Sequence, residues 1–139
     1  MNAEWLLPLL AALPVALAGV SLALPSASAI LRFGAAGTLI TAGLAAVATV
    51  TVFRAGPVSA GWGWLRLDAL SAYHLAVMML IFSLSALYAV GYFRAEIEAG
   101  EFSRKTARRY GGLWFGSLAA MLVTLLSDNL GLMWVGIEA

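Results

Sequence analysis

A single acidic residue, Glu138, lies inside an apolar run near the end of this sequence. The run begins at Leu130, directly after the polar pair Asp128-Asn129. Counted as a helix from Asn129, Glu138 lies roughly 13 Å along the axis, near the middle of a bilayer about 30 Å thick. Apolar surroundings disfavour the charged carboxylate, which brings proton exchange towards neutral pH. We therefore expect Glu138 to serve as an intramembrane proton relay; the alternative is a solvated glutamate at the end of a short chain.

Weaker candidates lie on two other apolar runs. On the third run, His74, Ser85 and Tyr88 share one helical face. On the fourth run, Asp128 follows Ser117 and Thr124 at helical spacing. A histidine can transfer protons near neutral pH, but a lone one is more often held by a neighbouring helix, and Asp128 suits a boundary turn. We expect a secondary polar path through four residues: His74, Ser85, Tyr88 and Asp128.

The composition excludes most other chemistry. Of 139 residues, 63% are hydrophobic and 11% are charged, which favours lipid over water as the surrounding medium. There is no cysteine and one histidine, so we expect no metal site, iron–sulfur ligation or other cofactor in this chain. No catalytic triad or nucleotide fingerprint is present, and a net charge of +1 gives no reason to expect nucleic acid.

The apolar runs predict an all-α membrane protein with four transmembrane helices and a truncated fifth. We interpret residues 1–139 as one transmembrane region with approximate spans at 5–24, 33–53, 69–93, 110–127 and 130–139. The segment 58–67 contains glycines, tryptophans and partial alternation, which indicates a short extended segment or hairpin at the membrane surface. The last run stops too early to cross a bilayer, so we expect the chain to be a fragment of a longer protein.

The basic residues predict an orientation. Five of the eight Lys and Arg residues fall in the segment 94–109, which we expect to be a cytoplasmic loop. Helix counting then places Arg32 on the same side and the N-terminus on the extracytoplasmic side. Arg54 and Arg66 then lie on the extracytoplasmic side, contrary to the rule that basic residues favour the cytoplasmic side. In the second run, small residues recur at 34, 38, 42 and 46, a spacing that lets another helix approach closely.

The sequence contains three characteristic stretches: Leu67-Asp68-Ala69-Leu70-Ser71, Leu87-Tyr88-Ala89-Val90-Gly91-Tyr92, and Ser127-Asp128-Asn129-Leu130-Gly131-Leu132-Met133-Trp134-Val135-Gly136-Ile137-Glu138-Ala139. These stretches resemble the antiporter-like, proton-translocating membrane subunits of respiratory complex I and group 4 membrane-bound hydrogenases. The last resembles the family pattern DNLL-x-x-x-x-GWE, with Ile137 where tryptophan is usual. That variant is most similar to the F-type membrane component of hydrogenase-4. Ala86 stands where the family commonly has a histidine.

The resemblance implies the N-terminal part of a fourteen-helix subunit, with Glu138 at the family's essential carboxylate and its lysine partner on a seventh helix. It implies a non-catalytic subunit of an oxidoreductase complex in a prokaryotic inner membrane, of the hydrogenase-4, formate-hydrogenlyase or NADH-quinone oxidoreductase type. The implied partners are the lipid bilayer, other membrane subunits and a peripheral hydrogenase or dehydrogenase arm with iron–sulfur subunits. Two alternatives stay open: a subunit of a multisubunit cation/proton antiporter, and a small stand-alone membrane protein with a structural or assembly role.

Overall fold

The computed structural model describes residues 5–138; Ala139, the end of the fifth expected run, lies outside the described residues. The helices and strands, in chain order, are α1 (Leu6–Ala23), α2 (Ala27–Ala55), β1 (Val58–Ala60), β2 (Leu65–Leu67), α3 (Ala69–Glu98), α4 (Arg104–Leu126) and α5 (Leu130–Glu138). Together they confirm the predicted fold class.

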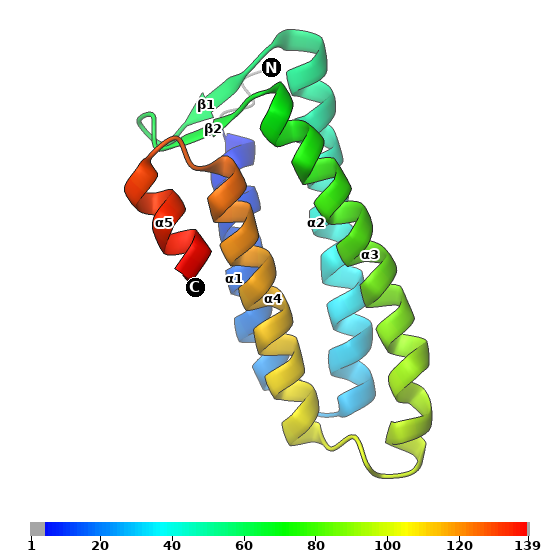
Figure 1. The fold of residues 1–139 in the computed structure, drawn as a ribbon. Helices are drawn as coiled ribbons and strands as arrows, with labels where there is room; N and C mark the ends of the chain where they lie inside the picture. Colours follow the sequence, from blue (N-terminus) through cyan, green and yellow to red (C-terminus); the bar gives the residue numbers. More distant parts are fainter. Residues whose placement is uncertain (1–4, 139) are drawn as a thin grey trace.

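Four long helices form an antiparallel bundle, with the small sheet at one end and the short α5 beside α4 (Figure 1). In the pairing of the long helices, α2 packs on α3 and α1 packs on α4. The buried side chains that join these pairs are apolar and include Leu7, Leu10, Phe115, Leu118 and Leu122. The close van der Waals packing of these side chains holds α1 and α4 together in the bundle.

The outer surface of the long helices carries many large apolar side chains. Each of α1, α2, α3 and α4 is long and apolar enough to cross a membrane. Large apolar side chains on their outer faces are widely exposed; Leu80 and Leu84 on α3 are each 60% accessible, and Leu113 on α4 is 73% accessible. A soluble protein rarely exposes apolar patches of this extent, so the structure is that of a multi-pass membrane protein.

The helices extend beyond the apolar runs at the end opposite the sheet. The second helix begins at Ala27, ahead of the run expected from 33, because the Ser26 side chain accepts a hydrogen bond from the Ala29 N–H. The fourth begins at Arg104, where Ser103 caps the Thr106 N–H in the same way. The expected loop 94–109 is therefore mostly helix, and only residues 99–103 lie between α3 and α4.

The segment between α2 and α3 is a two-stranded antiparallel hairpin, as expected. Val58 pairs with Leu67 and Ala60 with Leu65. Its turn has left-handed backbone at Gly61 (φ +62°), Trp62 (φ +56°) and Gly63 (φ +86°), a region in which only glycine is unstrained. The Trp62 side chain is fully exposed at the tip, so its ring is free to enter the headgroup layer, where tryptophan is favoured.

The small residues of α2 pack closely, but the face differs from the one expected. Thr38, Thr41, Ala45 and Ala48 are buried, whereas Ala46 is exposed. Near the middle of the helix, a Cβ on Gly37 would lie 2.9 Å from the Phe115 ring of α4. The prediction that another helix packs closely on α2 is thus right, but the prediction that Ala46 lies on the contact face is wrong.

Candidate functional site

The fifth helix is held against α4 through Gly136. A Cβ added at Gly136 would lie 2.5 Å from the Thr124 Oγ1 and 3.0 Å from the Ala120 carbonyl oxygen. Only a residue without a side chain allows the two backbones to approach this closely. Gly136 is accordingly the one buried residue of α5 among those described. Glu138 lies two residues further along the same helix.

The turn before α5 fixes where that helix starts. The Ser127 hydroxyl donates to the Asn129 carbonyl oxygen at 2.7 Å, and the Asn129 side chain accepts from the Leu132 N–H at 3.1 Å. The Asp128 N–H donates to the carbonyl oxygen of Trp64 in the hairpin at 2.9 Å. These bonds cap α5 and tie the turn to the hairpin, so α5 runs back from the hairpin end alongside α4 (Figure 1).

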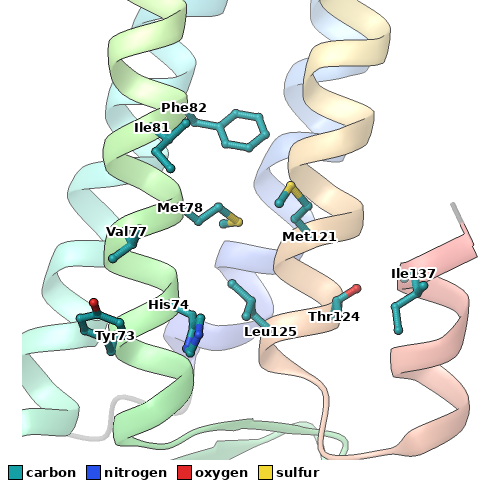
Figure 2. A pocket seen from close by; sticks show the side chains of 11 residues that line it. Tyr73, His74, Val77, Met78, Ile81, Phe82, Met121, Thr124, Leu125 and Ile137 are labelled. Atoms are coloured by element: carbon teal, nitrogen blue, oxygen red, sulfur yellow. The ribbon is translucent and has the colours of Figure 1, made fainter.

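A cavity of about 650 Å³ lies between α3, α4 and α5. Its lining is mostly apolar, and Tyr73, His74 and Thr124 are the lining residues that carry polar side-chain atoms (Figure 2). The lining residues are Tyr73, His74, Val77, Met78, Ile81 and Phe82 of α3, Met121, Thr124 and Leu125 of α4, and Gly136 and Ile137 of α5. A second hollow of about 330 Å³ shares Phe82 with this cavity and continues along α4 past Ser117. The groove between α3 and α4 therefore follows much of the bundle.

His74 is positioned by its own helix. Its Nδ1 lies 2.9 Å from the Leu70 carbonyl oxygen, and the Tyr73 ring stands edge-on to it, with ring centroids 5.5 Å apart. The side chain is exposed in the bundle and contributes to the cavity wall near the hairpin end (Figure 2). One ring nitrogen is thus satisfied within α3, which leaves the other available to water or to a neighbouring helix.

The structure brings together some of the predicted residues and separates others. His74 and Thr124 line the same cavity, and Ile137, the neighbour of Glu138, lines it from α5. Ser85 and Tyr88 are exposed further along α3 and line no part of this cavity. Tyr88 instead stacks on Tyr92, with ring centroids 5.6 Å apart. Asp128 lies in the turn before α5 and lines no part of this cavity either.

The position of Glu138 follows from the contact at Gly136. Successive residues of a helix are separated by about 100°, so Glu138 is turned by about 200° from Gly136 and faces away from α4. Its side chain is exposed in the described bundle, in agreement with this geometry. The carboxyl group therefore lies on the face of α5 that residues 5–138 leave uncovered. Within those residues, no cluster of three or more histidine and carboxylate side chains could hold a metal ion.

A polar contact in the interior was not anticipated from the sequence. The Trp114 indole Nε1 donates to the Thr38 Oγ1 at 2.9 Å, and Thr38 donates to the Gly34 carbonyl oxygen at 2.8 Å. Thr38 is fully buried, so this bond joins α2 and α4 away from water. The available signal was a tryptophan in an apolar run, since a buried indole N–H needs an acceptor.

Comparison with known proteins gives one informative similarity. Over 71 residues, 51% of this chain, the sequence is 35% identical to the hydrogenase-4 component F homolog of Methylacidiphilum infernorum (isolate V4). The matched stretch spans only 15% of that protein's length. No family model and no solved structure matches the chain. About half of this multi-pass membrane chain is thus similar to a part of a hydrogenase-4 component F homolog.

Proposed function

We propose that this chain forms part of a proton-translocating membrane subunit of a redox-driven complex of the hydrogenase-4 or formate-hydrogenlyase type. The observation that carries the proposal is the placement of Glu138 on α5, which runs back beside α4 from the hairpin end. Counted from Leu130, the carboxylate lies about 12 Å along that helix. A carboxylate at this depth in the apolar layer of a membrane would be costly, and such groups commonly mark ion pathways.

The proposed role of Glu138 is to take up and release a proton within the membrane. A carboxylate in an apolar medium requires a nearby cation to compensate for its lost hydration. A cationic side chain that approaches and leaves the uncovered face of α5 would drive proton release and uptake. In the secondary path, His74 is the residue best placed to contribute, because it lines the cavity that reaches α5. Ser85, Tyr88 and Asp128 lie outside this cavity.

The proposed setting is a prokaryotic inner membrane. The basic end of the bundle, with Arg32 and the segment 94–109, would face the cytoplasm, and the hairpin and N-terminus would face outward. Other membrane subunits and a peripheral arm with iron–sulfur subunits would supply the redox chemistry. This chain would then be a non-catalytic part of an oxidoreductase complex.

The test is Glu138→Gln in the intact complex. Inverted membrane vesicles are supplied in turn with formate, hydrogen or NADH, and acidification is followed with a pH-sensitive dye. We expect proton translocation to fall by about a hundredfold, as for loss of a proton-transfer group, while assembly is unchanged. Glu101→Gln, an exposed residue between α3 and α4, is the matched control and should translocate normally. Undiminished translocation by Glu138→Gln refutes the relay.

A second measurement separates this proposal from the cation/proton antiporter. The same vesicles receive a sodium gradient and no electron donor. A redox-driven subunit gives no acidification under these conditions, whereas an antiporter exchanges sodium for protons. If sodium alone drives the exchange and Glu138→Gln abolishes it, the proposed relay role of Glu138 stands. The proposal of a redox-driven complex is then wrong, and the chain belongs to an antiporter.

A further inference from the structure

A polar hollow lies at the basic end of the bundle, far from α5. It has a volume of about 360 Å³ and lies between the first turns of α2 and the last turns of α3. Arg32 and Ser28 line it from α2, and Arg94 and Glu98 from α3. Two arginines from different helices thus share one cavity, which sets this place apart from the other basic residues at this end.

Both arginines lie at the same depth relative to the apolar layer. Arg32 directly precedes Phe33, where the uncharged part of α2 begins, and Arg94 directly follows Phe93, where the uncharged part of α3 ends. In a membrane, this boundary is the level of the lipid phosphates. Guanidinium groups at this level are well suited to a phosphate, because their planar donors match its oxygens.

The charge of the hollow fits a single negative charge. The Arg94 Nε donates to the Glu98 carboxylate at 2.9 Å, in a pair whose side chains are 79% and 66% exposed. The terminal nitrogens of Arg94 remain free of that bond, since a guanidinium has five N–H donors. Two arginines and one glutamate give the hollow a formal charge of +1, which complements the charge of a phosphodiester.

The remaining wall of the hollow is apolar and suits a lipid better than a free ion. Leu31, Val90, Gly91 and Ile97 complete the lining. At Gly91 an added Cβ would find no atom within 4 Å, so the absent side chain leaves open space beside the arginines. A glycerol backbone and the start of an acyl chain can occupy such a surface, whereas inorganic phosphate gains nothing from it.

We infer that the hollow between α2 and α3 binds the phosphodiester of an anionic phospholipid, with Arg32 and Arg94 as its ligands. The inference is independent of Glu138, because it concerns the opposite end of the bundle. Basic pockets between transmembrane helices are a general means of recognising anionic headgroups. The site would anchor the ends of α2 and α3 at the membrane surface.

The test is native mass spectrometry of the purified protein in mild detergent with added phosphatidylglycerol or phosphatidylethanolamine. We expect phosphatidylglycerol to be retained preferentially and Arg32→Gln/Arg94→Gln to lower that retention by about tenfold or more. The control Lys105→Gln/Arg109→Gln removes the same charge from the same end without touching the hollow, and should retain lipid as the wild type does.

A further variant keeps the inference testable if the double arginine variant does not fold. Gly91→Leu fills the open space without changing any charge, and we expect it to lose phosphatidylglycerol as well. Equal loss in the control and in Arg32→Gln/Arg94→Gln would show general attraction to anionic lipid and overturn the site. Equal retention of phosphatidylethanolamine, or displacement of phosphatidylglycerol by millimolar inorganic phosphate, would also overturn it.

Discussion

The contact between α5 and α4 predicts that Gly136→Ala is destabilising. The new methyl group would lie 2.5 Å from the Thr124 Oγ1, 3.0 Å from the Ala120 carbonyl oxygen and 3.0 Å from the Thr124 backbone nitrogen. The hydroxyl can rotate only by giving up its 2.9 Å bond to the Ala120 carbonyl oxygen, and the backbone atoms cannot move away without moving α4. Overpacking of this kind costs about 1–3 kcal/mol.

The measurement is the free energy of unfolding, followed by circular dichroism as the protein is titrated from mild detergent into sodium dodecyl sulfate. Gly116→Ala on α4 is the matched control, because an added Cβ there meets no atom within 4 Å. That control should be neutral or stabilising by up to about 1 kcal/mol, since alanine favours helix over glycine. Combining Gly136→Ala with Thr124→Ala should restore part of the loss, because it removes the hydroxyl and leaves the backbone contacts. A Gly136→Ala variant as stable as Gly116→Ala would refute the close packing of α5.

Three further predictions use the same unfolding measurement. Thr38→Val removes the acceptor of the Trp114 indole N–H and should lower the free energy of unfolding by about 1 kcal/mol. An unchanged free energy of unfolding would show that the indole N–H finds another acceptor. The hydrogen bond from the Ser71 backbone N–H lowers the pKa of Asp68 below its ordinary 3.8. This cap therefore stabilises α3 at pH values above the ordinary pKa of Asp68, and its contribution is lost as the pH falls through the lower pKa of the folded state. The free energy of unfolding of Asp68→Asn should therefore depend less on pH in the acid range. Trp62→Gly removes the strain of a left-handed backbone at a residue with a side chain, and should raise the free energy of unfolding in detergent by about 1 kcal/mol. A lower free energy of unfolding would show that the Trp62 ring contributes to packing.

Hydropathy predicted which segments form the long apolar helices, but not where these helices end. The run expected over 33–53 became α2, which starts at Ala27, since a helix can continue into the polar layer wherever its side chains allow. The true ends follow capping residues such as Ser26 and Ser103, whose signal is one side chain in a polar segment. The polarity of the segment 94–109 predicts a loop, but polarity alone does not distinguish a loop from a solvated helix end.

The sequence likewise predicts only part of the candidate site. Spacing placed His74, Ser85 and Tyr88 on one face of a helix, and the structure keeps the first in a cavity while the other two lie beyond it. Helical periodicity gives the direction of a side chain but not the neighbour it meets, which depends on the packing of α3 on α2 and of α4 on α1. The bond between Trp114 and Thr38 was missed for the same reason, since its partners are distant in the sequence.

The face that carries Glu138 leads to a last prediction about function. Gly136 packs on α4, so anything that displaces α5 there also displaces Glu138, two residues later on the same short helix. Proton transfer depends steeply on position, and a misplacement of about 1 Å can cost about a hundredfold in rate. Under the proposed relay function, Gly136→Ala should reduce proton translocation in the intact complex far more than its modest loss of stability explains. Gly116→Ala should leave translocation unchanged. If Gly136→Ala is destabilised and still translocates protons normally, then the contact of α5 with α4 does not set the rate of the proposed relay.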